Sequence, residues 1–223
     1  MAASGGIQQD KAGQRSAKRR KRRDRGDIRS LLIETACIEF GQHGFEGAST
    51  RAIAARVDAH QPQINYHFSC KEDLWRASVN HLFSLLDSAM AGVEDIEDLG
   101  ERFAETIRRQ VRFAAEHPEL NRIIVQEASS PSARMEWVTE THVRPRFEER
   151  RKNWQQLRRD NIAAPVDELV VHHVLIGAAT LPYVNAPEAE LLIGSSPTDP
   201  AHIEAHAESL VACFLPGLSS TET

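Results

Sequence analysis

The sequence predicts an all-α fold of about nine helices, and three observations support that prediction. Aromatic residues make up only 6% of the chain, with just two tyrosines. The sequence has no run of alternating β-branched and polar residues, the pattern of a half-buried strand. Apolar residues instead recur three and four positions apart from residue 27 to residue 215, the spacing of one face of an α-helix.

A glycine separates the first predicted helix from a second, shorter one. The first begins at Asp27 and ends near Gly44, a residue type that often closes helices in the left-handed conformation. The second opens after Ser49 or Thr50, either of which can cap it. The residues predicted to form the core of these helices are Leu32, Ile33, Ala36, Cys37, Phe40, Ile53, Ala54 and Val57.

A tight turn leads from the second helix to a third. The turn is Asp58-Ala59-His60, and the third helix runs from Gln61 or Pro62 to about His67. A proline in the first helical turn costs no hydrogen bond, because its missing N–H would be unpaired there anyway. Two short helices joined in this way, braced by a preceding helix, form a helix-turn-helix, whose second helix is slim enough for the major groove of DNA.

A long helix follows, and the rest of the chain alternates helices with clear breaks. Ser69-Cys70-Lys71-Glu72 matches a capping box and predicts the start of a helix that runs through Met90. Gly92 and the acidic segment 94–98 end it. Further helices are predicted at about 99–116, 119–128, 134–160, 165–184 and 200–215.

The charge of the chain is unevenly distributed. Residues 1–26 carry nine Lys or Arg against two acidic residues, a balance of +7, although the whole chain has a net charge of −5. This arm has little apolar surface to bury and is predicted to be disordered in isolation. A basic arm on an acidic body favours contact with nucleic acid at one place. We assign that contact to Arg19, Arg20, Arg22 and Arg23.

Residues 28–75 strongly resemble the DNA-binding domain of the TetR family of transcriptional regulators. The resemblance rests on anchors in the family's order and spacing: Ile33, Ala36, Phe40, Gly44-Phe45, Ser49-Thr50-Arg51-Ala52-Ile53-Ala54, Gln61-Pro62, Ile64-Asn65-Tyr66-His67-Phe68 and Lys71-Glu72-Asp73-Leu74. It implies a homodimer that binds a palindromic operator in double-stranded DNA, most simply as a repressor, and is released by a small-molecule effector. The implied organisation is an arm (1–26), a DNA-binding domain (27–73), an effector and dimerisation domain (74–217) and a tail (218–223).

The resemblance also implies roles for individual residues. Thr50 and Arg51 correspond to phosphate contacts, as do Tyr66, His67 and Lys71. Amide side chains can pair bidentately with adenine, so the residues expected to read bases are Gln61, Gln63 and Asn65. Three positions depart from the family's common pattern: Asp58 stands where many relatives have Gly, His60 where many have Ser or Thr, and Asn65 where Tyr is frequent.

The two last long helices are predicted to pair two chains. Their apolar stripes would be ordinary core in a monomer, but in the TetR family they typically form half of a four-helix interface. The stripe in 165–184 comprises Leu169, Val170, His173, Val174, Gly177, Ala178 and Leu181. The stripe in 200–215 comprises Ile203, Ala207, Leu210, Val211 and Phe214.

An effector pocket is expected among the aromatic and charged residues of the larger domain. Each of the aromatic residues is more simply explained as core, and Glu127, Arg134 and Arg144 either form an internal ion pair or orient a polar ligand. The residues assigned to the pocket are Phe103, Phe113, Glu127, Trp137, Arg144, Phe147, His173 and Tyr183.

Other classes of function are less consistent with the sequence. No G-x-S-x-G, P-loop, dinucleotide or H-E-x-x-H motif is present, so we predict no enzyme and no cofactor. The pairs His172-His173 and His202/His206 have no third ligand at a suitable spacing, so we predict no metal site. Three distant cysteines and the lack of an apolar run of about 20 residues favour a nucleoid-associated protein of the cytoplasm, away from membranes. The alternative function is an architectural nucleic-acid binder driven by the basic arm.

Overall fold

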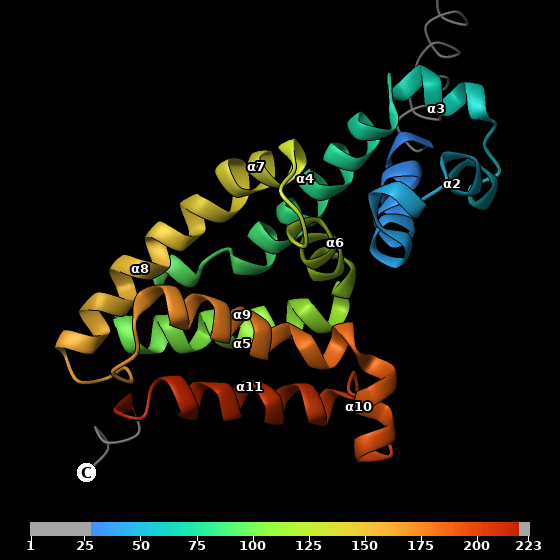
Figure 1. Cartoon of the computed structure of the whole chain (residues 1–223). Helices are drawn as coiled ribbons and strands as arrows, with labels where there is room; N and C mark the ends of the chain where they lie inside the picture. The colour runs from blue at the N-terminus through green and yellow to red at the C-terminus, as the bar shows by residue number, and fades with distance from the viewer. Residues whose placement is uncertain (1–27, 219–223) are drawn as a thin grey trace, which may run out of the picture.

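The computed structural model describes residues 28–218, and every regular element in that span is a helix (Figure 1), which confirms the predicted all-α fold. The first helix covers 28–47. The elements after it are α2 (Thr50–Arg56), α3 (Gln61–His67), α4 (Lys71–Met90), η1 (Val93–Asp95), α5 (Leu99–Glu116), α6 (Pro118–Ala128), α7 (Ala133–Val138), η2 (Thr139–Val143), α8 (Arg144–Arg159), α9 (Glu168–Val184), α10 (Ala186–Ile193) and α11 (Pro200–Phe214).

Several predicted helix ends are confirmed by their backbone geometry. The Ser49 hydroxyl accepts the Ala52 N–H at 3.3 Å and so caps α2. Gly92 has a φ of +81° directly after α4. Gly44 is also left-handed, at φ +68°, but a further helical turn follows it, so the first helix ends later than predicted, at residue 47.

The predicted capping box at Ser69–Glu72 does not form. Helix α4 begins at Lys71, with Cys70 as an N-cap that makes no side-chain hydrogen bond. Glu72 instead accepts from Arg76, one turn further along, at 2.7 Å. The carboxylate that was expected to reach back to the start of the helix is therefore held by an i,i+4 ion pair.

Two further differences from the prediction lie in the larger domain. The helix expected over 134–160 is divided by the π-helical η2, because Pro145 in the first turn of α8 cannot donate a backbone hydrogen bond to the turn before it. The sequence also gave no sign of α10. This eight-residue helix has no buried residue, and its large apolar side chains, Leu191, Leu192 and Ile193, are exposed.

Three of the long helices form a layer, and α4 extends away from it (Figure 1). Helices α5, α9 and α11 pack against one another, and α8 crosses their end. Helix α4 leads away from this layer to α2 and α3, which lie at the far end of the molecule. The short helices are therefore presented to solvent at a distance from the main helical layer.

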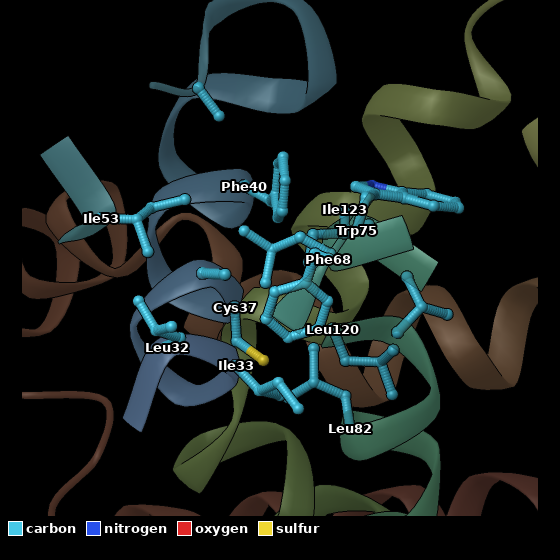
Figure 2. Close-up of a cluster of buried hydrophobic side chains, with 14 of the residues drawn as sticks. Leu32, Ile33, Cys37, Phe40, Ile53, Phe68, Trp75, Leu82, Leu120 and Ile123 are labelled. Atoms are coloured by element: carbon cyan, nitrogen blue, oxygen red, sulfur yellow. The ribbon is translucent and has the colours of Figure 1, made fainter. Parts of the chain in front are cut away.

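The hydrophobic core has two parts. One lies between α5, α8, α9 and α11. The other joins the first three helices to α4 and α6, and Figure 2 shows Leu32 and Phe40 of the first helix in the same cluster as Trp75, Leu120 and Ile123. Because this cluster is continuous, α4 and α6 link the short N-terminal helices to the larger domain.

Within 28–218 no single helix is both long and apolar enough to cross a membrane. The α9–α10 pair passes the same test of length and composition when taken together, but the two helices are bent by 78°.

Candidate nucleic-acid interface

Polar contacts fix the position of α2 on the first helix, and a left-handed residue shapes the turn from α2 to α3. Glu39, buried on the first helix, accepts the Ser49 N–H at 3.1 Å and pairs with Arg56 at 3.2 Å. These contacts hold both ends of α2 against the first helix. The turn into α3 requires a left-handed residue, and Asp58 adopts φ +52°, the role predicted for it in place of glycine.

A surface groove lies where α2, α3 and the start of α4 meet. Five of the residues predicted to contact DNA line this groove: Thr50, Arg51, Gln61, Asn65 and Lys71. The N-terminus of the long helix α4 opens into the same place, and its unpaired N–H groups favour an anion there. The structure thus brings together hydroxyl, amide and cationic groups that can bind a phosphate backbone and adjacent bases.

The two glutamines predicted to read bases have partners within the chain. Gln63 accepts the backbone N–H of His60 at 2.7 Å and so satisfies the start of α3. The Gln61 amide nitrogen lies 3.3 Å from the Asn65 side-chain oxygen and 3.4 Å from the Thr50 hydroxyl. The Gln61 oxygen is buried without a hydrogen-bond partner among the described residues.

The remaining predicted contacts lie on the exposed side of α3 and beside it. Tyr66 is 66% exposed and its ring packs edge-on against His67 at 5.0 Å. Lys71 donates to the Glu46 carbonyl at 3.1 Å and lies 5.0 Å from the centre of the Phe45 ring. The predicted arm contacts Arg19, Arg20, Arg22 and Arg23 lie outside the described residues. Sequence reasoning missed Arg29, which stacks on the Phe68 ring at 5.2 Å beside α3.

A polar junction connects this end of the molecule to α6 and α7. Arg134 pairs with Glu127 at 3.1 Å, the internal ion pair that the sequence allowed. The same guanidinium lies 3.7 Å from the Phe45 ring centre and 3.8 Å from Glu46. Gln126 donates to the Gly41 carbonyl at 3.0 Å. Movement of α6 or α7 would therefore be transmitted to the first helix.

The larger domain contains a cavity of about 130 Å³ between α4, α5, α6, α8 and α9. Of the eight residues predicted to bind an effector, only Phe113 lines it. The guanidinium of Arg150 and the imidazole of His172 also line it, and sequence reasoning missed both. Arg146 and Arg150 lie one turn apart in a helix with many charged residues, and such a sequence is typical of a solvent-exposed face.

The other seven predicted effector residues have different surroundings. Phe103 and Tyr183 belong to the core of the larger domain, and the Tyr183 hydroxyl lies 3.0 Å from His206. Arg144 pairs with Glu140 at the surface, and His173 is exposed. The other three contact neighbouring side chains. Glu127 forms an ion pair with Arg134, and the Arg76 guanidinium lies 4.7 Å from the centre of the Trp137 ring. The centres of the Phe147 and His172 rings are 5.1 Å apart.

The two stripes predicted to pair two chains differ in their exposure. On α9, the predicted stripe is largely exposed and includes Leu169, Val170, Val174 and Leu181. On α11, four of the five predicted residues are buried against the rest of the chain. That stripe packs against α5 and is core. The exposed residues of α11 include Glu204 and Glu208, which pair with Arg112 and Arg108, and the small residues Ala201, Ala205, Ser209, Ala212 and Cys213.

In the part of the chain that the structure describes, no group of three or more His, Cys, Asp or Glu residues is arranged to hold a metal ion. His206, one of the histidines considered, faces Tyr183. Burial lowers the pKa of His206 and raises that of Tyr183 to about 12.

Comparison with known proteins extends this picture. Residues 32–77 match the family described as "Bacterial regulatory proteins, tetR family". The chain is similar to a Bacillus subtilis protein described as "Probable HTH-type transcriptional regulator YttP", with 24% identity over 116 residues. The match covers 50% of this chain and 56% of that protein, so the chain spans about half the length of its relative.

Solved structures share the fold over most of the chain. The structure of AibR in complex with isovaleryl coenzyme A and operator DNA is 20% identical, with a TM-score of 0.70 over 84% of this chain and 98% of AibR. The ketosteroid transcriptional regulator KstR2 of Mycobacterium tuberculosis is 15% identical, with a TM-score of 0.65 over 84% of this chain and 95% of KstR2. At these identities the likeness is one of fold.

Proposed function

We propose that the chain is a ligand-responsive repressor of the TetR family, because residues 32–77 match that family of bacterial regulatory proteins. It binds a palindromic operator as a homodimer and is released when a small molecule occupies the larger domain. We propose the domain limits predicted from sequence, with the protein acting at the nucleoid and having no enzymatic activity. The observation that carries the proposal is the groove where Thr50, Arg51, Gln61, Asn65 and Lys71 meet.

Base reading is proposed for the exposed side of α3. Asn65 and Tyr66 are exposed there, whereas Gln61 and Gln63 are half-buried, and Asn65 uses only its side-chain oxygen to accept a hydrogen bond from Gln61. An amide that pairs bidentately with adenine contributes about 1–3 kcal/mol of discrimination. We therefore rank Asn65 first for sequence choice, with Gln61 and Gln63 contributing when DNA replaces their internal partners. Thr50, Arg51, Tyr66, His67 and Lys71 are assigned to the phosphate backbone.

Dimerisation is proposed through the exposed apolar side of α9 and the small outer residues of α11. Gly177 supports close helix approach, because a side chain there would meet nothing of its own chain within 4 Å. Two recognition helices on a twofold dimer must lie about 34–36 Å apart to enter successive major grooves. A ligand that favours another separation lowers operator affinity by its differential affinity for the two states. The contacts of Arg134 with Glu127, Phe45 and Glu46 are the proposed path by which a ligand in the larger domain changes the separation of the recognition helices.

Selection of bound sequences from a random DNA library tests the proposal. Purified full-length chain at near-physiological salt is expected to recover an inverted repeat. In the selected site, Asn65→Ala should relax the preference at particular base pairs. Lys71→Ala should weaken binding to all sequences alike and lower the salt slope by about one.

The alternative function predicts a different result from the same selection. An architectural nucleic-acid binder driven by residues 1–26 would recover no motif, and its binding would fall steeply with salt. Deletion of 1–26 would then abolish binding. For a specific regulator the same deletion should reduce affinity and its salt dependence but leave the recovered motif and the dimer unchanged.

A further inference from the structure

Arg150 is a partly buried cation, and no Asp or Glu of the described residues pairs with it. Its guanidinium lines the cavity between α4, α5, α6, α8 and α9, and within 28–218 its side chain makes one hydrogen-bond contact, at 2.8 Å with Nδ1 of His172. Burial lowers the pKa of Arg150 to about 10, so it remains charged at neutral pH. Burial and the neighbouring Arg150 lower the pKa of His172 to about 4, so the imidazole is neutral and its Nδ1 accepts a hydrogen bond from the Arg150 guanidinium.

The other charges at the cavity are neutralised. Arg146 pairs with Asp87 and also donates to the His142 carbonyl at 2.8 Å. His117 lies 3.3 Å from Glu119. None of the residues lining the cavity is an Asp or Glu. The cavity therefore has one positive charge with no compensating anion, an arrangement that costs free energy unless an anion occupies it.

The rest of the cavity wall is mainly apolar. Its apolar side chains come from four helices and include Phe83, Leu86, Phe113, Leu120, Ile124 and Ile176. A dry apolar cavity of about 150 Å³ is large enough for benzene. At about 130 Å³, this cavity has room for roughly the same number of non-hydrogen atoms.

Two neutral amides near Arg150 differ in their availability. The Asn121 amide is committed to the Thr180 hydroxyl at 2.8 Å, and that hydroxyl donates in turn to the Ile176 carbonyl. Gln110 also lines the cavity and makes no side-chain hydrogen bond within the described residues. Its N–H group is therefore available to a second oxygen of a ligand held by Arg150.

From this arrangement we propose that the cavity binds a small organic carboxylate with a short apolar tail, in the range of about four to six carbons. Arg150 pairs with the carboxylate, Gln110 contributes a further hydrogen bond, and the tail lies against the apolar wall. This inference rests on the proposed function, because it names the chemical class of the effector. The fixed guanidinium distinguishes an acid from a neutral molecule of the same shape, since an uncharged amide leaves the buried charge uncompensated.

Isothermal titration of the full-length protein at pH 7 tests the proposal with defined probes. Hexanoate is the first probe, hexanamide is its uncharged match, and butanoate and octanoate test the tail length. The variants are Arg150→Met and, as a matched control on the same helix, Arg151→Met. Arg151 is exposed, and within 28–218 its one ion pair is with Glu148 at the surface.

The expected result is saturable binding of at least one carboxylate, with one site per chain. Replacing hexanoate by hexanamide, or Arg150 by Met, should weaken binding about tenfold or more, and Arg151→Met should leave it unchanged. Without ligand, Arg150→Met should melt at the same temperature as the unmodified protein or higher, because it removes an uncompensated buried charge. A purely structural Arg150 would instead give a lower melting temperature.

Three outcomes would overturn the proposal: no saturable binding by any carboxylate of the series, equal binding of acid and amide, or full binding by Arg150→Met. The comparison of acid with amide uses the unmodified protein, so it remains decisive even if a variant does not fold. Failure of the DNA selection to yield a motif would count against the proposed function and would leave these titrations unaffected.

Discussion

Glu39 is a buried carboxylate whose importance is visible only in the folded chain. It lies among apolar neighbours on the first helix, yet it connects that helix to both ends of α2 through Ser49 and Arg56. The hydrogen bond from the Ser49 N–H contributes most to stability, because Ser49 lies at the start of α2, the first helix of the helix-turn-helix. The Arg56 pair contributes less, since that guanidinium is half-exposed and screened by water.

Glu39→Ala is therefore expected to lower the free energy of unfolding by about 1–3 kcal/mol, since it leaves a backbone N–H unpaired and opens space in the core. Urea unfolding followed by circular dichroism measures this change. Glu34→Ala, on the exposed face of the same helix, is the control and should cost less than about 0.5 kcal/mol. Equal effects of the two substitutions would contradict the role given to Glu39.

Gln63 combines a structural and a recognition role, and the two can be separated. Gln63→Ala removes the acceptor for the His60 N–H, so it should lower stability by about 0.5–2 kcal/mol. It should also relax base preference if the amide turns toward DNA. Gln63→Glu keeps an acceptor for the cap, so its stability should stay close to that of the unmodified protein while its base preference changes. Unfolding curves and operator selections for the two variants test this separation.

At the scale of single elements, Gly44 shows how one residue shapes a helix end. Its φ of +68° turns the chain toward α2, and a Cβ there would lie 2.9 Å from the Gln126 side-chain oxygen. The glycine is required by the backbone conformation, whereas the close atom belongs to the end of the flexible Gln126 side chain. Gly47, three residues on, lies in the last helical turn without a positive φ.

Alanine substitutions at these two glycines should have opposite effects. Gly44→Ala should destabilise the protein by about 1–2 kcal/mol because a side chain is strained in the left-handed region. Gly47→Ala should be neutral or stabilise it by up to about 1 kcal/mol because alanine favours the helix. Thermal unfolding of the two variants measures both effects, and a stable Gly44→Ala protein would show that the turn can adopt another conformation.

At the scale of the whole molecule, α9 faces two environments. One side is buried against α5, α6 and α11, and the other side exposes a row of large apolar residues. Exposed apolar patches of this kind mark interaction sites in soluble proteins. The same row was predicted from sequence to pair two chains, and its exposure in the single chain supports the proposed dimer.

Val174→Glu tests this surface because Val174 is 50% exposed near the middle of the row. The variant is expected to sediment as a monomer, since a desolvated carboxylate would have no partner in an apolar interface. Val125→Glu is the matched control, because Val125 is 57% exposed on α6, away from the row. A dimer that withstands Val174→Glu would place the interface elsewhere.

The all-α fold, most helix boundaries and the helix-turn-helix could be predicted because they depend on local chemistry. Apolar periodicity, the cap at Ser49 and the left-handed residues at Gly44 and Gly92 are encoded within a few positions of one another. Helix α10 and the break at η2 could not be predicted in the same way. The first has no buried stripe, and the second falls within a continuous helical pattern.

The sequence alone thus determined the class of fold, the resemblance of residues 28–75 to a DNA-binding domain and the residues expected to contact DNA. Only the tertiary structure decided which stripes are core and which are exposed, and which charges are paired. The stripe of α11 is covered by α5, whereas that of α9 is not. Arg146 has Asp87 as a partner and Arg150 has no carboxylate. Packing between distant segments creates these differences, and periodicity within one helix carries no information about them.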